Sequence, residues 1–206
     1  MLTGNIYRLT GTSACQTLSS CAGAADEVKG TIAYDGNGNI SSNSSGAGDL
    51  SLTASNAITY DGVGNLLTVD GPLAGTADTT RYRYDAARQV VGITSPDPDG
   101  AGPLKMRASR VTYRADGQVT RQEKGTVLSQ SDADWANFVP SEVVDIAYDA
   151  NSRAVTQKLS NAGTNYAMSQ TSYDGLGRTD CVALRMNTAI YGSPRDCQKF
   201  RVRAGG

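Results

Sequence analysis

The sequence predicts an all-β fold of consecutive antiparallel hairpins in a curved or spiralling sheet, with one short helical insertion. A tyrosine-led heptapeptide occurs in six copies, five of which begin with Tyr-Asp, and the leading tyrosines are 26, 24, 29, 35 and 25 residues apart. A recurring period of this length is typical of repeat architectures. The 206 residues include 23 Gly and 10 Tyr but only two Phe, a composition of many short strands and turns. We therefore expect residues 1–206 to form a single repeat array.

Each heptapeptide predicts a strand, a turn and a second strand. β-Forming residues precede each tyrosine, the following Asp can accept hydrogen bonds from turn amides, and a Gly four positions after the tyrosine suits positive φ. The turns are expected near residues 34–40, 60–66, 84–90, 113–119, 148–154 and 173–179. The predicted turn residues are Tyr34, Asp35, Gly38, Tyr60, Asp61, Gly64, Tyr84, Asp85, Tyr113, Gly117, Tyr148, Asp149, Tyr173, Asp174 and Gly177.

Neighbouring repeats have to cover one another, because a lone hairpin is marginally stable in water. The tyrosine ring, with its polar end, suits such a half-buried surface. Turn chemistry alone accounts for each Asp, so we interpret the Tyr-Asp pairs as structural and not as catalytic.

The N-terminal part of the chain contains a half-repeat and a loose connection. Residues 4–6, Gly-Asn-Ile, match the second half of the repeat at residues 38–40, which predicts that the chain begins inside a repeat of a longer protein. The Ser/Gly-rich residues 41–48 are predicted to be a loose connection. Residues 50–52, Leu-Ser-Leu, are predicted to be a strand.

Two insertions interrupt the later repeats. Residues 95–103 contain three prolines and are expected to form an exposed loop, because proline removes ladder donors. Ser131 or Asp132 is a good N-cap, and Trp135 and Phe138 lie three apart on one face. A short helix is therefore predicted over residues 132–137, capping a sheet edge or the end of its apolar face.

Four cysteines form two pairs, six and sixteen residues apart: Cys15 with Cys21 and Cys181 with Cys197. Pairing near neighbours is the simplest of the three connectivities that four cysteines allow. Such bridges would form in an oxidising compartment. These spacings do not suit a zinc site, and the chain has no histidine.

The sequence gives no constellation for catalysis, a metal or a cofactor. Without histidine there is no Ser-His-Asp or Cys-His arrangement. The pairs Asp97 with Asp99 and Asp132 with Asp134 offer no fixed separation for glycosidase chemistry. Residues 35–39 begin like a calcium loop but lack its later Gly and Glu, and no dinucleotide motif is complete. A net charge of −1 without a basic run argues against nucleic acid, and no apolar stretch is long enough for a membrane span.

The units Tyr-Asp-x-x-Gly-(Asn/Arg)-(Leu/Ile/Val) resemble the YD repeats of bacterial RHS-repeat proteins, to which Tc toxin shells and the teneurins are similar. The resemblance covers most of the chain, and residues 95–102, 131–138 and 181–197 look like insertions in long RHS proteins. It implies a spiralling β-sheet that forms a hollow shell around a toxic C-terminal domain, or a large surface module. The RHS core segment with its autoproteolytic aspartates is absent from this sequence, so no processing activity is carried over.

Three functional hypotheses follow. The first is a non-enzymatic structural segment of an RHS shell in a secreted or surface-exposed bacterial protein, with further RHS repeats and a toxin cargo as partners. The second is an extracellular module that binds carbohydrate or a cell-surface protein through exposed tyrosines such as Tyr82, Tyr166 and Tyr191. The third, an enzyme, is disfavoured by the absence of histidine.

Overall fold

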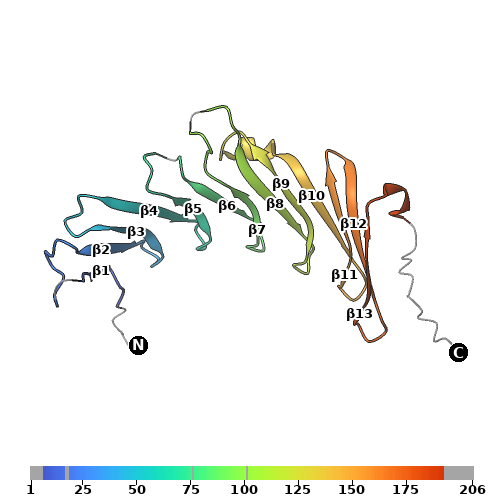
Figure 1. Cartoon of the computed structure of the whole chain (residues 1–206), viewed down its shortest axis with the longest axis horizontal. Coiled ribbons are helices and arrows are strands. Elements are labelled where there is room, and N and C mark those ends of the chain that lie inside the picture. The colour runs from blue at the N-terminus through green and yellow to red at the C-terminus, as the bar shows by residue number, and fades with distance from the viewer. Residues whose placement is uncertain (1–6, 17–18, 76, 101, 193–206) are drawn as a thin grey trace. The chain divides into compact units, whose positions relative to one another are not determined.

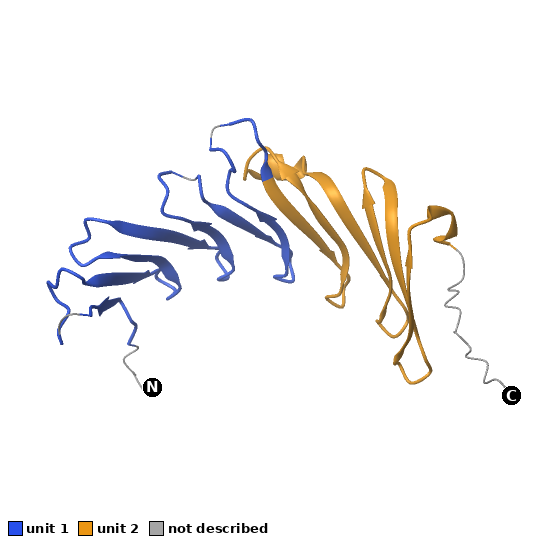
Figure 2. Ribbon diagram, viewed as in Figure 1, with its two compact units in different colours: residues 1–106 blue, residues 107–206 orange. Residues whose placement is uncertain are grey.

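The computed structural model describes residues 7–16, 19–75, 77–100 and 102–192. These residues form 13 β-strands, one short α-helix and one 3-10 turn (Figure 1). The chain divides into two compact units, residues 1–106 and 107–206 (Figure 2). The predicted all-β class, with consecutive antiparallel hairpins and one helical insertion, is confirmed.

In unit 1 each strand pairs antiparallel with the next strand along the chain, so spatial order follows sequence order. The strands are β1 (Gly11–Ala14), β2 (Val28–Tyr34), β3 (Ile40–Ala47), β4 (Thr53–Tyr60), β5 (Leu66–Asp70), β6 (Thr80–Tyr84) and β7 (Val90–Thr94).

Unit 2 follows the same rule with longer strands. Its elements are β8 (Met106–Tyr113), β9 (Val119–Val127), α1 (Asp132–Ala136), β10 (Val139–Tyr148), β11 (Ala154–Asn161), β12 (Thr164–Tyr173), β13 (Thr179–Arg185) and the 3-10 turn η1 (Thr188–Ile190).

A register shift accompanies the Tyr-Asp turns. In five hairpins the shift falls at the tyrosine itself, because two residues of the outgoing strand oppose one residue of the incoming strand there. The tyrosines at these shifts are Tyr34, Tyr60, Tyr84, Tyr148 and Tyr173. The bulge is thus part of the repeated unit.

The structure corrects two predictions in unit 1. The Ser/Gly-rich residues 41–48, predicted to be a loose connection, lie almost wholly within β3, which pairs with β2 on one side and β4 on the other. Residues 50–52, predicted to be a strand, lie in the turn before β4, where Leu50 has a φ of 61°. Pairing on both edges outweighs the weak intrinsic preference of serine and glycine for strands.

The apolar core is small, because each unit is a single layer of sheet. Among the described residues, five hydrophobic side chains are buried, and all five belong to unit 2: Ala108, Val127, Phe138, Val143 and Met168. In the described part of unit 1 the fully covered side chains are polar, and Thr94 has no exposed surface. Contacts between hairpins therefore have to supply much of the cohesion.

Helix α1 lies where the chain passes from β9 to β10 in unit 2. It ends at Ala136, with Asn137 as its C-cap, and Ser131 accepts the Asp134 amide at the N-terminus (3.1 Å). The rings of Trp135 and Phe138 are 5.7 Å apart. Phe138 is buried, and the Arg110 guanidinium lies 4.7 Å from the centroid of its ring.

Candidate functional site

The Tyr-Asp turns repeat one hydrogen-bonding arrangement. In the first described turn, the amide of Asp35 donates to the Asn39 carbonyl (2.8 Å) and the amide of Gly38 donates to the Asp35 carbonyl (3.0 Å). The Oδ1 atom of Asp35 accepts from the amides of Asn37 (2.9 Å) and Asn39 (2.8 Å). One carboxylate oxygen thus satisfies two turn amides that the strand ladder leaves without partners.

The other close copies keep these bonds. Asp61, Asp149 and Asp174 each accept from the amides two and four residues further on. Asp85 accepts the amide of Gln89 (2.8 Å). Where Arg114 replaces the Asp, the backbone bonds of the turn persist, and Asp116 accepts the Gln118 amide instead (3.1 Å). The backbone geometry is therefore retained even where the sequence has diverged.

The fourth position after each tyrosine has positive φ. Glycine occupies it in four turns, with φ of 88° at Gly38 and Gly64, 84° at Gly117 and 80° at Gly177. In the two turns without this glycine, Arg88 (φ 65°) and Ser152 (φ 60°) adopt the same left-handed conformation. The bulged turn therefore requires this conformation, and non-glycine residues occupy it at an energetic cost.

The fifth position explains the Asn/Arg alternation of the repeat. The side-chain amide of Asn39 donates to Asp35 Oδ2 (3.0 Å), and Nε of Arg153 donates to Asp149 Oδ2 (2.8 Å). Both residue types thus supply a donor to the second carboxylate oxygen. The sequence showed the alternation but did not reveal this shared partner.

These bonds lower the pKa of the turn carboxyls. Hydrogen bonding by the Asn39 side chain lowers the pKa of Asp35, and bonding by Arg153 lowers the pKa of Asp149. The Arg178 amide, followed by its side chain, lowers the pKa of Asp174. Burial pushes the pKa of Asp61 upward, but the bonds from Asn65 outweigh it, and the net shift is downward. A depressed pKa keeps these groups ionised as acceptors and is opposite to what a general acid requires.

The leading tyrosines join consecutive hairpins. The hydroxyls of four of them donate to a backbone carbonyl earlier in the chain, and in three cases the acceptor is six positions after the preceding leading tyrosine. The donor and acceptor pairs, at 2.8–3.1 Å, are Tyr34 with Leu9, Tyr60 with Ile40, Tyr148 with Val119 and Tyr173 with Ala154. We call this set the tyrosine ladder.

Long polar side chains interlock adjacent turns. The guanidinium of Arg153 lies 4.4 Å from the centroid of the Tyr173 ring while it pairs with Asp149 (2.7 Å). Arg114 lies over Tyr148 in the same way, at 5.3 Å. These cation–π contacts add to the tyrosine ladder.

Two further interlocks use hydrogen bonds. Arg88 donates to the Asn65 side chain (3.0 Å) and to the Val63 carbonyl (2.5 Å) of the preceding turn. Gln118 donates to the Ser152 carbonyl of the following turn (2.7 Å). The contacts between successive turns are therefore cation–π contacts in some cases and hydrogen bonds in others.

A row of alternating charges crosses strands β8 to β11 of unit 2. Asp145 stands opposite Arg121 of β9 and Lys158 of β11, so the three side chains share one face. Arg121 pairs with Asp145 (3.0 Å) and with Glu123 (3.3 Å), and Arg110 pairs with Glu123 (2.6 Å). We call these five residues the charge row.

Glu123 is the buried member of the charge row, with 4% of its side chain exposed. Hydrogen bonding by Arg110 is the main cause of its lowered pKa. The Phe138 ring lies 4.7 Å from the Arg110 guanidinium and so covers the pair from above. Sequence reasoning missed this network, because its members are separated by up to 48 residues along the chain.

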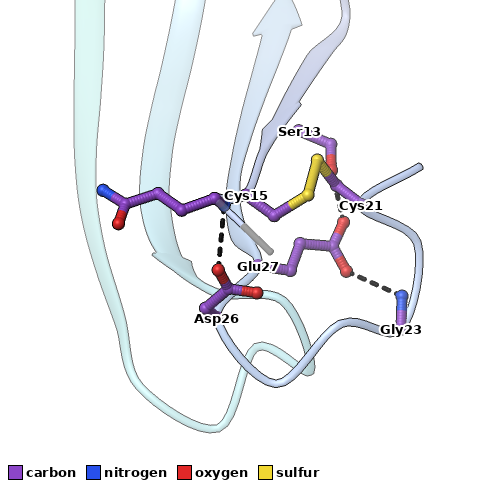
Figure 3. Close-up of a disulfide and its surroundings, with 7 residues drawn as sticks. Ser13, Cys15, Cys21, Gly23, Asp26 and Glu27 are labelled. Carbon is purple, nitrogen blue, oxygen red and sulfur yellow. Dashed lines mark hydrogen bonds between the residues drawn. A yellow bond between two sulfur atoms is a disulfide. The ribbon is translucent and has the colours of Figure 1, made fainter. Parts of the chain in front are cut away.

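A disulfide joins Cys15 to Cys21 next to β1 (Figure 3). The carboxylate of Glu27 accepts from the hydroxyl of Ser13 (2.5 Å) and from the amide of Gly23 (3.1 Å). Glu27 thereby ties the disulfide loop to the start of β2. The hydrogen bond from Ser13 is the main cause of its lowered pKa.

The second cysteine pair is described only in part. Cys181, on β13, is disulfide-bonded. Cys197, its expected partner, lies outside the described residues. The N-terminal half-repeat at residues 4–6 also lies outside them.

The three tyrosines proposed for ligand binding differ in exposure. Tyr166 is 51% exposed, whereas Tyr82 and Tyr191 are half-buried. Tyr82 lies on β6, Tyr166 lies on β12, and Tyr191 follows η1. Nothing in the described structure groups the three rings into one binding surface.

Carboxylates and cysteines do not assemble into a metal-binding cluster of three or more within the described ranges. A cleft of about 600 Å³ borders Glu27, Lys29 and Asp49. Its buried carboxylate, Glu27, is already committed to Ser13 and Gly23. None of the described helices is long and apolar enough to cross a membrane.

Comparisons with known proteins agree with the repeated geometry. The family model described as RHS Repeat matches residues 60–100. Comparison with curated proteins gave no match. Among solved structures, the crystal structure of TcdB2-TccC3-TEV matches with a TM-score of 0.55 and 16% identity, covering 88% of this chain and 9% of that one. The crystal structure of TcdB2-TccC3-Cdc42 matches with a TM-score of 0.37 and 14% identity, covering 76% of this chain and 9% of that one.

The chain thus spans about a tenth of the solved chains that it matches. At 16% identity the TcdB2-TccC3-TEV likeness shows a shared fold. The family match falls on two of the Tyr-Asp turns, residues 60–66 and 84–90, and the described hairpins repeat their geometry. These findings show an RHS repeat at residues 60–100 and a fold for the chain that is shared with the TcdB2-TccC3-TEV structure.

Proposed function

We propose that this chain is a non-enzymatic structural segment of an RHS β-shell. The observation that carries the proposal is the tyrosine ladder, because the hydroxyls of Tyr60, Tyr148 and Tyr173 each bind the backbone of the preceding hairpin. These recurring polar contacts join one hairpin to the hairpin before it. A wall element needs such contacts, whereas a catalytic site needs converging groups at one place.

A structural role also fits the state of the carboxylates. The turn aspartates are engaged by turn amides, and Glu123 is held by Arg110 and Arg121. The sequence contains no histidine. No group in this arrangement is poised for proton transfer, which supports assignment as a non-enzyme.

The shell would belong to a longer polypeptide, since the chain covers 9% of the TcdB2-TccC3-TEV chain. Further RHS repeats would be the direct partners of this segment. The completed shell would enclose or present a C-terminal toxin in a secreted or surface-exposed bacterial protein, where the disulfide at Cys15 and Cys21 would persist.

Protease protection in the longer parent polypeptide tests this proposal. The region beyond the repeats should resist protease in the wild type. Combined Tyr60→Ala and Tyr173→Ala changes should make it accessible, because they remove two rungs of the tyrosine ladder. A region equally accessible in the wild type and in the variant would contradict enclosure. The exposed change Leu176→Ala serves as the control.

A binding module is the second candidate, favoured by the exposed ring of Tyr166. Aromatic side chains with polar ends suit contacts to glycans and proteins. A glycan array with the purified chain tests it: saturable binding that Tyr166→Ala abolishes would support a binding role over a purely structural one. Binding to no glycan on the array would count against it.

A further inference from the structure

A cleft of about 490 Å³ lies on unit 2 at the end of the charge row. The residues that line it include six from three neighbouring strands and from the segment after η1: Asp145, Thr156, Lys158, Asn165, Met168 and Tyr191. Its volume is in the range of sites for small molecules. None of these six residues belongs to the tyrosine ladder, so a structural role in a wall leaves the cleft unexplained.

Strand register brings the strand residues of the cleft to one face of the sheet. Asp145 of β10 stands opposite Lys158 of β11, and Lys158 stands opposite Met168 of β12. Thr156 lies two residues before Lys158 on the same strand, so its side chain is on the same face. Met168 is 5% exposed. The cleft therefore combines an apolar, buried side chain with charged and hydroxylated ones.

Tyr191 provides an aromatic wall for the cleft. The 3-10 turn η1 contacts β12, and the Tyr191 carbonyl accepts from the side-chain amide of Gln170 (3.5 Å). Gln170 lies two residues after Met168, so this bond holds the segment against the face of β12 that carries Met168. Tyr191 is half-buried, and its hydroxyl is buried without a hydrogen-bond partner among the described residues. A ligand in the cleft would thus meet the ring of Tyr191 and not its hydroxyl.

Three polar groups in the cleft are available to a ligand. The carboxylate of Asp145 is engaged by Arg121 (3.0 Å) and, at a longer distance, by Lys158 (3.6 Å). The ammonium of Lys158 makes no other ion pair within the described ranges, and its side chain is 37% exposed. The hydroxyl of Thr156 and the side-chain amide of Asn165 line the cleft without a hydrogen-bond partner in the described part of the chain.

The charge balance favours a ligand with one negative charge. The charge row has three cations and two carboxylates, which leaves an excess of one positive charge. Lys158 is the member of the row at the cleft whose pairing is weakest. Asp145 lies beside it, so a multiply charged phosphate would be repelled more strongly than a single carboxylate.

We infer that this cleft binds a saccharide that carries a carboxylate, such as a uronic or sialic acid unit. The apolar face of the sugar ring packs on the Tyr191 ring, the carboxylate accepts from Lys158, and the sugar hydroxyls meet Thr156 and Asn165. A pyranose presents C–H groups on its faces and hydroxyls at its edge, which suits an aromatic wall with polar groups beside it. The inference rests on the second candidate function, the binding module, to which it gives a site and a ligand class.

Titration of the full chain with sialyllactose and with a galacturonate trimer tests the inference. Methyl-labelled methionine gives a local readout by NMR, because Met168 lines the cleft whereas Met106, at the start of β8, does not. The Met168 methyl should shift saturably while the Met106 methyl stays in place. Lactose, which lacks a carboxylate, should bind about tenfold more weakly than sialyllactose. AMP, which combines an aromatic base with a phosphate, should also bind more weakly.

Variants of Lys158 test the contact with the carboxylate. Lys158→Gln should raise the dissociation constant for sialyllactose about tenfold, the loss expected for a hydrogen bond to a charged group, and Lys158→Arg should raise it less. Asp145 keeps its pair with Arg121 in both variants. Lys124→Gln is the matched control, because Lys124 is 73% exposed and pairs with Glu142 outside the cleft.

Variants of Tyr191 test the aromatic wall. Tyr191→Ala should abolish the Met168 shift, whereas Tyr191→Phe should retain it, because the hydroxyl makes no hydrogen bond among the described residues. Tyr166→Ala is the control for loss of aromatic surface, since Tyr166 is 51% exposed and does not line the cleft. Thermal melts establish that each variant is folded, and the wild-type titration and the Phe and Arg variants remain decisive if Ala or Gln does not fold.

Four outcomes would overturn the inference. They are no saturable Met168 shift with either acidic saccharide, lactose or AMP binding as tightly as sialyllactose, equal weakening by Lys158→Gln and Lys124→Gln, and unchanged binding in Tyr191→Ala. Binding that Tyr166→Ala abolishes and the cleft variants leave unchanged would keep the binding module and remove this site. Protease protection of the parent polypeptide involves no saccharide, so the wall role fails or stands separately.

Discussion

The hydroxyl of Tyr173 donates a 2.9 Å hydrogen bond to the carbonyl of Ala154, which lies in the preceding hairpin. The same ring is covered by Arg153 at 4.4 Å. Tyr173, which lies on β12, thus contacts the preceding hairpin both through its hydroxyl and through its ring. The hydroxyls of Tyr60 and Tyr148 make hydrogen bonds of equivalent position, so the contact recurs along the chain.

Two substitutions of Tyr173 should distinguish the contribution of its hydrogen bond to stability from the contribution of its ring. Tyr173→Phe removes the hydroxyl and should lower the free energy of unfolding by about 0.5–1.5 kcal/mol. Tyr173→Ala also removes the ring and its cation–π contact, and should cost about 2–3 kcal/mol. Urea denaturation of both variants measures the difference. Equal losses for Phe and Ala would show that the ring contributes little.

The fourth residue after each leading tyrosine has positive φ, so exchanging glycine and another residue there should change stability in opposite directions. Gly64→Ala places a Cβ at φ 88° and should destabilise the chain by about 1 kcal/mol. Ser152→Gly removes the left-handed penalty of roughly 1–2 kcal/mol at φ 60°, which exceeds the added entropy of the unfolded chain, and should stabilise the protein by up to about 1 kcal/mol. Thermal unfolding of the two variants tests the signs. Stabilisation by Gly64→Ala would contradict the assigned turn geometry.

Glu123 should make stability depend on acid pH. Its pKa in the folded chain lies below the ordinary value of 4.5, so its contribution is present above that pH and is lost as the pH falls through the folded pKa. Glu123→Gln should therefore destabilise the chain by about 1–2 kcal/mol at pH 7 and by less near pH 3. Urea midpoints between pH 3 and pH 7 measure this. A constant difference across that window would show that Glu123 ionisation is not linked to folding.

Gly125 should tolerate no side chain. A Cβ there would overlap the carbonyl oxygen of Val139 and approach Phe138 Cζ to 2.8 Å. Gly125→Ala should cost about 2–3 kcal/mol through strain in β9 and in the aromatic cover of Arg110. Gly62→Ala is the control, since a Cβ at Gly62 meets nothing within 4 Å. Urea denaturation that found the two variants equally stable would argue against the packing of Phe138 on β9.

The disulfide between Cys15 and Cys21 should stabilise the β1 end of unit 1. Replacing both cysteines by serine should lower the free energy of unfolding by about 2 kcal/mol, mainly by freeing a short loop in the unfolded chain. Hydrogen exchange should show the loss at β1 and not at β10, which belongs to the other unit. Unchanged exchange at β1 would indicate that Glu27, through Ser13 and Gly23, is sufficient to hold the loop.

Local chemistry made the turns and their order predictable. In residues 60–66, Asp61 accepts hydrogen bonds from the amides of Val63 and Asn65, and Gly64 between them has positive φ. All of these features lie within seven residues, so the local sequence is sufficient to specify the hairpin turn. The helical insertion was predictable for the same reason, since Ser131 caps it and Trp135 lies next to Phe138 in space.

Contacts between distant residues were decided only by the tertiary structure. Residues 41–47 are part of a strand because β2 and β4 pair with its two edges, which the low strand preference of Ser and Gly did not indicate. The pairing of Arg110 with Glu123 and of Arg121 with Asp145 depends on strand register, and so does the position of Arg153 over Tyr173. The sequence by itself determined the all-β class and the tyrosine-led turns, but not the turn at residues 48–52. Register across the sheet determined which side chains meet, because it brings together residues whose separation along the chain exceeds the reach of any local pattern.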